Sequence, residues 1–377
     1  MQHNLILRGN KFNTDTNLFC LALSVYIILS YFFNNSITFM PSLWQINDTQ
    51  YLYMGLSIIG FALCAKFLHH IYINEISKMM ILILLAVISL INTNNIIVFL
   101  LLVFIAFGNH IDIEKVIKIN LLTKCVCLFA VIYLALSGTI QNLEFAKDGY
   151  YISAYGFKNP NLLAAVIFEI NLMLLYFNRN KIGFFGFFLF VVITGINFYL
   201  TRSRTPLYSS LIVFILFLLY KLLMNKDLIK SVFFKKNVIM GFKIFTVLLF
   251  LLVCFNINFF IRNGELLSSR FQLVHTFVTY YGLTLLGQEV MTVAGRTLDF
   301  GYVYLLLTYG ILYFFLFVMA YAKALNNAYL HNDLIEMLVI LAFLLYGIGE
   351  TTMLRIEYNF TLLFLVSVAW NSKYKRE

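Results

Sequence analysis

Long runs of apolar residues, separated by short polar segments, repeat along almost the whole chain. A helix needs about 20 apolar residues to cross the hydrocarbon core of a bilayer, and fewer where the bilayer thins. This pattern predicts an all-α polytopic membrane protein with about 12 membrane-spanning helices. The predicted spans are Leu18–Phe33, Tyr51–Leu68, Ser77–Ile91, Ile96–Gly108, Ile119–Ser137, Asn161–Phe177, Ile182–Leu200, Leu207–Leu223, Val238–Phe255, Gly301–Ala320, Leu334–Gly349 and Ile356–Trp370.

Composition supports the same class. The 377 residues are 62% hydrophobic and only 12% charged, whereas a soluble domain carries about 25% charged residues. The five cysteines lie in apolar segments, so they are interpreted as small core residues that form neither a disulfide framework nor a metal site. No internal repeat is visible. We therefore predict a single integral membrane domain over residues 1–377.

The net charge of +10 follows from the orientation that the loops predict. Lys and Arg collect in cytoplasmic loops, next to anionic lipid. If the N-terminus is cytoplasmic, most of the 27 Lys and Arg residues fall on the inner side. An even number of spans returns the C-terminus to the same side. We therefore predict that both termini are cytoplasmic and that nucleic acid is not a partner.

Two longer polar segments then fall outside, Gly138–Asn159 and the extracytoplasmic loop 256–300 between the ninth and tenth helices. Loops of that length usually have a role. The second loop contains apolar residues at steps of three and four, which predicts an amphipathic helix that could lie flat on the outer leaflet like a lid. The apolar positions are Leu267, Phe271, Val274, Val278, Tyr281 and Leu285, and the polar positions are Ser268, Gln272, His275 and Thr279.

Arg202 and Arg204 lie between the seventh and eighth predicted helices, on the outer side, where positive charge is scarce. Arg binds phosphate through paired hydrogen bonds, which are stronger at the edge of a low-dielectric bilayer than in water. Both residues are therefore candidates for an anion site. The alternative is that both reach to lipid headgroups as interface anchors.

The mouth of the sixth predicted helix carries a second polar group. Asn159 is typical of a helix N-cap, and Pro160 of the first helical position. Lys158 and Asn161 would face the outer mouth, where they could touch a ligand.

The large outer loop and the start of the tenth helix supply the third group, namely Arg270, His275, Arg296, Asp299 and Tyr302. A half-buried carboxylate at Asp299 could act as a general base, and so could His275. Asp299 could equally be a helix cap and His275 an ordinary surface histidine.

Three further ionisable residues need an explanation. Glu169 lies within the sixth predicted helix, where an ionisable group is a functional hypothesis by default. It could also be a protonated acid bonded to a neighbouring helix. Glu350 and Arg355, at the outer turn of the last hairpin, could form an ion pair or belong to the outer site.

In order and membrane side, these motifs resemble the O-antigen polymerase and ligase superfamily, the Wzy-type polymerases of bacterial surface polysaccharides. The resemblance covers roughly residues 153–315, and the first half of the chain resembles the family only as a run of helices. The matching motifs are Tyr155 to Asn161, Ser203 to Leu207, Ser269 to Leu273 with Leu286 and Gly287, and Asp299 to Gly310.

The resemblance implies a metal-independent membrane glycosyltransferase without a cofactor, acting at the outer face of the bacterial cytoplasmic membrane. Its substrates would be polyprenyl-pyrophosphate-linked oligosaccharides, and its partners could include a flippase and a chain-length regulator. A hydroxyl of the incoming repeat unit would attack the anomeric carbon of the growing chain and release polyprenyl pyrophosphate. By position, Arg204, with Arg202, and Arg270 would hold that pyrophosphate, in agreement with the electrostatics of a departing anion.

The resemblance has one departure. Ligase-type members carry a histidine at the position of Asp299, so the aspartate favours a polymerase of capsule or exopolysaccharide clusters over a ligase. Asp299 is the first choice of base and His275 the second. Lys158, Asn161, Arg296 and Tyr302 would bind substrate.

Three other functions compete with this interpretation. A flippase for the same lipid-linked oligosaccharide would place charges along a cavity through the bilayer midplane, whereas most unusual polar residues here lie outside. A ligase-like glycan transferase would use a similar outer site. A non-catalytic scaffold would not need outer arginines.

Overall fold

The computed structural model describes residues 2–35, 48–69, 73–147, 149–179, 184–224, 228–254, 269–293 and 295–370. Nearly all of its regular structure is helical. The chain divides into two compact units. Unit 1 comprises Met1–Met79, Ile105–Tyr208 and Trp370–Glu377, and unit 2 comprises Met80–Phe104 and Ser209–Ala369. The single domain that we inferred from the sequence stays a prediction.

Within the described residues, five helical segments are long and apolar enough to cross a membrane: Thr14–Phe32, Glu75–Thr93, Ile113–Leu136, Pro160–Phe177 and Gly301–Leu330. Six shorter apolar helices accompany them, Leu56–Lys66, Ile96–Ala106, Gly186–Thr201, Arg204–Tyr220, Leu334–Tyr346 and Phe360–Trp370. These segments are those of a membrane protein. The number of spans and their orientation stay predictions.

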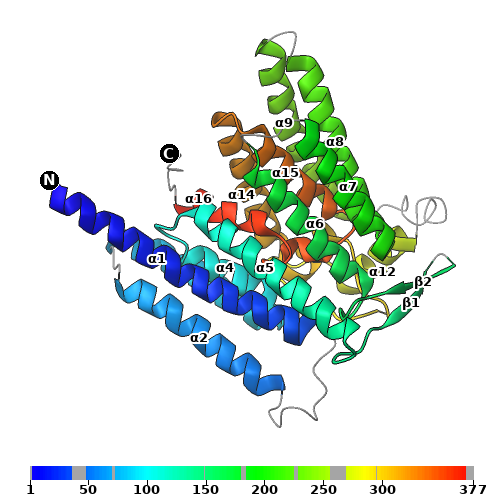
Figure 1. Ribbon diagram of the computed structural model, residues 1–377, viewed down its shortest axis with the longest axis horizontal. Helices are drawn as coiled ribbons and strands as arrows, with labels where there is room; N and C mark the ends of the chain where they lie inside the picture. Colours follow the sequence, from blue (N-terminus) through cyan, green and yellow to red (C-terminus); the bar gives the residue numbers. More distant parts are fainter. Residues whose placement is uncertain are drawn as a thin grey trace. The chain divides into compact units, whose positions relative to one another are not determined.

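Unit 1 is built on five helices: α1 (Gln2–Leu29), α2 (Asp48–His69), α5 (Ile113–Leu136), α6 (Pro160–Phe177) and α7 (Phe184–Thr201). A π-helical turn, η1 (Ser30–Asn35), continues α1. Helices α5, α6 and α7 lie side by side (Figure 1).

Two contacts between α6 and α7 show that these helices run in opposite directions. Asn197 of α7 donates to the Ala164 carbonyl near the start of α6, and Asn171 of α6 donates to the Phe190 carbonyl near the start of α7. The two helices are therefore antiparallel. Unit 1 thus has two ends, and the end that carries Pro160 also carries Thr201.

Unit 2 contains α9 (Leu228–Cys254), α12 (Ser269–Tyr281), α13 (Gly301–Tyr304), α14 (Gly310–Leu330) and α15 (Leu334–Tyr346). Three helices, α3 (Ile73–Thr93), α4 (Ile96–Ala106) and α8 (Arg204–Met224), each have residues in both units. The predicted hairpin of the third and fourth spans corresponds to α3 and α4, which only Asn94 and Asn95 join.

The predicted helix Gly301–Ala320 is interrupted. A π-helical segment, η2 (Leu305–Tyr309), separates α13 from α14, and Gly310 has a φ of +87°. The loop segment 284–288 fits into this break: the Gln288 N–H donates to the Thr308 carbonyl (2.8 Å), and the Ile311 N–H donates to the Thr284 carbonyl (3.0 Å). A part of the predicted outer loop is therefore built into the helix.

The prediction of one continuous helix over Ile356–Trp370 is wrong. The chain forms two 3₁₀ turns, η3 (Thr351–Leu354) and η4 (Phe360–Leu363), before the short helix α16 (Phe364–Trp370). The segment is buried in unit 2, where Asn359 donates to the Met353 carbonyl (2.6 Å) and to the Tyr321 hydroxyl (3.1 Å). Irregular backbone is tolerated at membrane depth only where the protein itself satisfies its polar groups. Side chains do so here.

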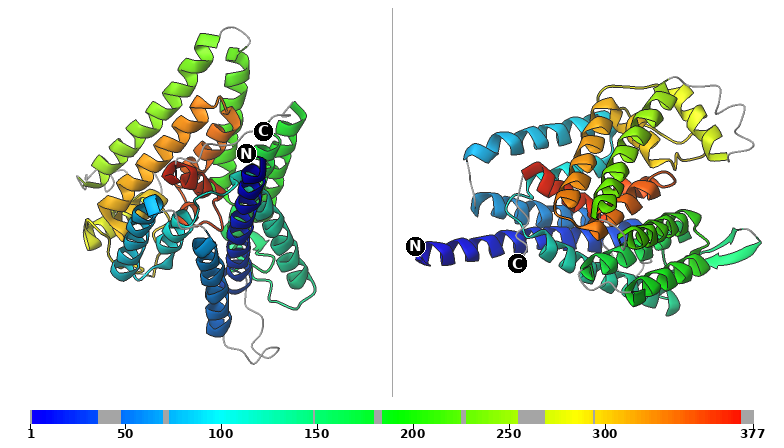
Figure 2. Two further views of the ribbon diagram at one scale, coloured as in Figure 1. Left: turned by 90° about the vertical axis from the view of Figure 1, so that its left-hand side faces the viewer. Right: turned by 90° about the horizontal axis from the view of Figure 1, so that it is seen from above.

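The two segments that the sequence predicts outside the membrane contain two ordered elements. The strands β1 (Glu144–Lys147) and β2 (Tyr150–Ser153) pair in an antiparallel hairpin, which projects past the neighbouring helices of unit 1 (Figure 2). The predicted amphipathic helix is confirmed as α12, whose Val274 and Val278 are buried and whose Gln272 and Thr279 are exposed. Leu285 was wrongly included in its apolar face, because the helix ends at Tyr281 and Leu285 is exposed. Its other predicted members Leu267 and Ser268 lie outside the described residues.

Candidate functional site

A tight turn joins α7 to α8 and carries both candidate arginines. Helix α7 ends at Thr201 and α8 begins at Arg204. The Arg202 N–H donates to the Phe198 carbonyl (2.8 Å), and Arg202 has a φ of +49°. This is the αL form of helix ending, which most often uses glycine. The Thr201 hydroxyl completes the turn by donating to the Asn197 carbonyl (2.7 Å) and accepting from the Ser203 N–H (3.3 Å).

Aromatic rings surround the Arg202 guanidinium. Its Cζ lies 4.7 Å from the ring centre of Tyr150, 5.7 Å from that of Tyr199 and 5.8 Å from that of Phe198. A guanidinium over an aromatic face is attracted by the ring quadrupole. This contact links the α7–α8 turn to β2. Arg204, two residues on, is exposed.

The mouth of α6 has the predicted cap. The Asn159 side chain accepts from the Leu162 N–H (2.9 Å), and Pro160 is the first helical residue. Gly156, just before, has a φ of +86°, and a Cβ there would lie 2.8 Å from Ile140 Cδ1. Only glycine fits this approach to α5. Lys158 is exposed and Asn161 partly exposed at this same mouth.

The remaining predicted residues lie in unit 2, on or after α12. His275 is half-buried on α12. Arg270 is in the first turn of the same helix, and its side chain lies outside the described residues. Arg296 is exposed in a tight turn, in which its backbone exchanges two hydrogen bonds with that of Val293 (3.0 and 3.1 Å).

Asp299 precedes α13, and its exposure to solvent differs from the prediction. The sequence predicts a half-buried carboxylate, but Asp299 is exposed, because it lies in the loop two residues before α13 begins at Gly301. The Thr297 hydroxyl donates to its Oδ1 (3.3 Å). The N-cap residue of α13 is Phe300, so Asp299 does not cap this helix.

Tyr302 is an interior residue. Its side chain is fully buried, and its hydroxyl donates to the Leu344 carbonyl of α15 (2.7 Å). A fully buried side chain does not support the predicted contact of Tyr302 with substrate. The nearby Tyr304, which we did not single out, accepts from Asn95 Nδ2 (2.9 Å). No local signal connects two residues so distant in sequence.

Arg355 forms an ion pair with Glu357, a buried carboxylate two residues on. Its Nε and Nη2 each lie 2.7 Å from Oε1 of Glu357. The ion pair of Arg355 with Glu350 stays a prediction. The Arg355 guanidinium also lies 5.2 Å from the Tyr358 ring centre. These contacts hold the irregular segment between η3 and η4 in place.

Glu169 has a charged partner inside unit 1. Its Oε1 lies 2.5 Å from Lys124 Nζ on α5, and both side chains are fully buried. Asn120, one turn before Lys124, is also buried. Glu169 is thus bonded to a neighbouring helix through a lysine, and a functional role for it stays a prediction.

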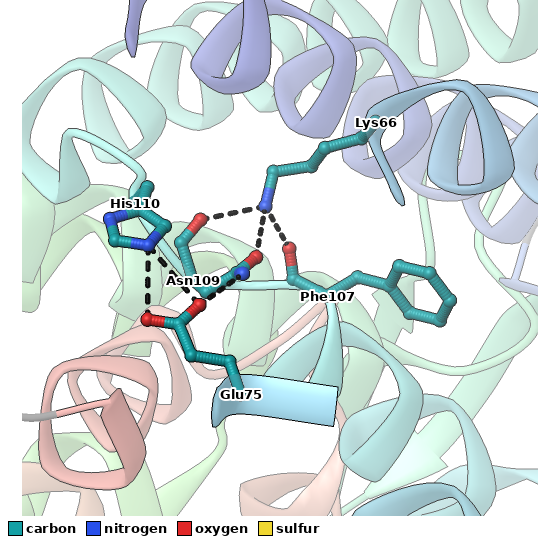
Figure 3. Close-up of polar contacts among 5 residues, drawn as sticks. All are labelled: Lys66, Glu75, Phe107, Asn109 and His110. Atoms are coloured by element: carbon teal, nitrogen blue, oxygen red, sulfur yellow. Dashed lines mark hydrogen bonds and ion pairs between the residues drawn. The ribbon is translucent and has the colours of Figure 1, made fainter. Parts of the chain in front are cut away.

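The opposite end of unit 1 holds a polar cluster that sequence reasoning missed (Figure 3). Lys66 donates to the Phe107 carbonyl and to the carbonyl and side-chain oxygens of Asn109 (2.7 and 2.8 Å). Asn109 donates to Glu75 (2.9 Å), and His110 Nε2 lies 3.1 Å from the same carboxylate. The cluster ties α2 and α3 to the turn before α5.

The candidate residues therefore fall into two sets, one in each unit. One end of unit 1 carries Lys158, Asn161, Arg202 and Arg204. Unit 2 contains Arg270, His275, Arg296 and Asp299. The comparisons with known proteins found nothing similar: no protein-family model, no curated protein and no solved structure matches the chain.

Proposed function

We propose that the protein is a polysaccharide polymerase of the outer face of the bacterial cytoplasmic membrane. It joins oligosaccharide repeat units that are carried on polyprenyl pyrophosphate. A hydroxyl of the incoming repeat unit attacks the anomeric carbon of the growing chain. The new glycosidic bond forms as the bond to pyrophosphate breaks, and the hydroxyl proton passes to a base.

Each step has a candidate residue. Arg204 and Arg270 hold the pyrophosphate, whose negative charge grows as it departs. Asp299 takes the proton, with His275 as the second choice. Lys158, Asn161 and Arg296 bind the sugar and phosphate groups of the two substrates.

The observation that carries the proposal is the arginine turn of α7 and α8. It shares one end of unit 1 with the capped mouth of α6 and the β1–β2 hairpin, and Arg204 is exposed there. Positive residues at that end oppose the charge bias of the other loops. Asp299 is exposed and does not cap α13, so its proposed role as a base rests on the resemblance of its motif and not on burial.

One observation favours a transporter instead. Buried ionisable residues within spans often mark ion or substrate pathways, and Lys124 and Glu169 form such a pair. A flippase would move the same lipid-linked oligosaccharide.

The size of the surface glycan separates these functions. Deleting the protein in its native host should leave single repeat units on the surface if it is a polymerase. Lipid-linked repeats retained on the inner leaflet would indicate a flippase, and full-length chains that stay unattached would indicate a ligase.

Variants returned to the deletion strain test the residues. We expect Arg204→Ala and Asp299→Asn each to reduce long-chain polysaccharide by about 100-fold or more, because each removes a group that acts in the transition state. The matched control for Asp299→Asn is Glu289→Gln, another exposed carboxylate of the same segment. Normal chain lengths in the first two variants, at wild-type protein levels, would remove the assigned roles.

A further inference from the structure

The outer surface of α7 is a stripe of large apolar side chains that ends next to Arg202. Phe188, Val192, Ile196 and Tyr199 follow one another at steps of four, four and three residues, and all are exposed. In a membrane protein such a stripe faces lipid. Tyr199, which is 72% exposed, is its last member. Tyrosines collect at the membrane–water interface, so this end of α7 lies at headgroup level.

Helix α5 has a similar stripe. Its exposed members Leu122, Val126, Phe129, Tyr133 and Leu136 also recur at steps of four and three. Tyr133 lies near the end of α5 that adjoins the mouth of α6, as the approach of Gly156 to Ala135 shows. Two lipid-facing stripes in unit 1 therefore carry an exposed tyrosine near the same end.

The backbone at Arg202 favours another residue. Its φ of +49° puts it in the left-handed region, at a position that glycine occupies most often. An L-residue with a Cβ is sterically strained in that conformation. Nothing in the turn itself requires an arginine, so the reason for it must lie in the side chain.

That side chain is prepared to bind an anion. The three rings of Tyr150, Phe198 and Tyr199 lie against the guanidinium, whose five N–H donors point outward in its plane. Among the residues that the structure describes, no acceptor takes a hydrogen bond from these donors. The contrast is Arg179 at the opposite end of unit 1, which also stacks on a tyrosine, Tyr176, but is paired with Glu114.

We propose that Arg202 binds the headgroup phosphate of a bulk membrane phospholipid at the end of α7. Tyr150, Phe198 and Tyr199 form the walls of the site. The site opens toward the bilayer, because Tyr199 belongs to the lipid-facing stripe. Planar guanidinium donors match a phosphate in two parallel hydrogen bonds. The proposal depends on the membrane placement of unit 1 and not on polymerase activity, and it gives Arg202 a role separate from that of Arg204.

Native mass spectrometry of the purified full-length protein tests this site. The delipidated protein is titrated with phosphatidylglycerol, and the bound lipids are counted. We expect Arg202→Gly to weaken the tightest binding about tenfold, which corresponds to about 1.4 kcal/mol. Arg202→Gly should still fold, because glycine suits the backbone at this position. Arg179→Gln, the matched control, should leave the affinity unchanged.

Further ligands identify the chemistry. Monoacylglycerol, which has no phosphate, should bind equally to wild type and Arg202→Gly, and inorganic pyrophosphate should not displace phosphatidylglycerol. Equal phosphatidylglycerol affinity in wild type and Arg202→Gly would overturn the proposal. The proposal would also be overturned if Arg202→Gly weakened the binding of polyprenyl phosphate but not that of phosphatidylglycerol. That result would place Arg202 in the substrate site. Because lipid binding is counted directly, its failure is distinct from any change in glycan length.

Discussion

At the scale of single residues, the buried contact between Lys124 and Glu169 has a large energetic consequence. Two fully buried opposite charges 2.5 Å apart lose their hydration on folding, and their attraction offsets that loss only while both are present. The pair fixes how α5 faces α6. Apolar side chains alone specify this poorly in a bilayer, where lipid is as apolar as a neighbouring helix.

Removing one charge of this pair should therefore destabilise the folded protein much more than removing both. We expect Lys124→Met to lower the free energy of unfolding by about 3–5 kcal/mol, because it leaves Glu169 buried without its counter-charge. The double variant Lys124→Met/Glu169→Leu should recover most of that loss. Thermal unfolding of purified protein in detergent measures both. If the double variant is as unstable as the single one, the pair is not what couples the two helices.

At the scale of elements, the break between η2 and α14 positions part of the outer loop. Gly287 and Gly310 have φ values of +95° and +87° and lie back to back. A Cβ on Gly287 would lie 2.5 Å from the Thr308 carbonyl oxygen, and one on Gly310 would lie 2.5 Å from the Gly287 nitrogen. The loop segment 284–288 can approach the helix only because both residues are glycine. This seam fixes the chain between α12 and Asp299 to unit 2.

Alanine at either glycine should open this seam. We expect Gly287→Ala and Gly310→Ala each to lower the free energy of unfolding by about 2–5 kcal/mol, from backbone strain together with overpacking. Gly241→Ala, in α9, is the control: a Cβ there meets nothing within 4 Å, and alanine favours a helix by about 1 kcal/mol. Melting temperatures of the three variants report the difference. An unchanged melting temperature in Gly310→Ala would contradict the close approach.

At the scale of the whole molecule, the distribution of charge predicts the sidedness. In unit 1 the arginine turn, the α6 mouth and the hairpin share one end, whereas the cluster around Lys66 and Glu75 lies at the other. The positive-inside bias predicts that the arginine turn lies outside. A cysteine label that reports the side of the membrane must be placed at an exposed residue. Ser203, within the arginine turn, is buried and therefore unsuitable.

Exposed lysines at the two ends provide those labels. In a variant without native cysteines, Lys158→Cys should react with a membrane-impermeant maleimide in intact cells, and Lys118→Cys should react only after permeabilisation. Both lysines are exposed, so a difference reports the side of the membrane and not burial. Labelling of Lys118→Cys in intact cells, with Lys158→Cys protected, would invert the topology and remove the outer-face anion site.

Sequence alone determined the local features of this protein. Apolar runs long enough for a bilayer placed most of the helices, since burial in lipid depends only on the chain's own hydrophobicity. The Asn159 cap and Pro160 were predictable because both act within one helical turn. The period of Val274 and Val278 likewise predicted α12, since it depends on neighbours three and four residues apart.

Only the tertiary structure decided which distant residues meet. Hydropathy scores each segment of the chain by itself and so cannot show which segments meet. Three such contacts are the Lys124–Glu169 pair, the Gly287–Gly310 seam and the stacking of Tyr150 on Arg202. The stretch Ile356–Trp370 is apolar enough as a whole to predict a helix, so hydropathy could not show that it begins with irregular backbone and a 3₁₀ turn. Its course is set by the hydrogen bonds of Asn359. Long-range contacts of this kind leave no local period, because their partners come together only when the helices pack.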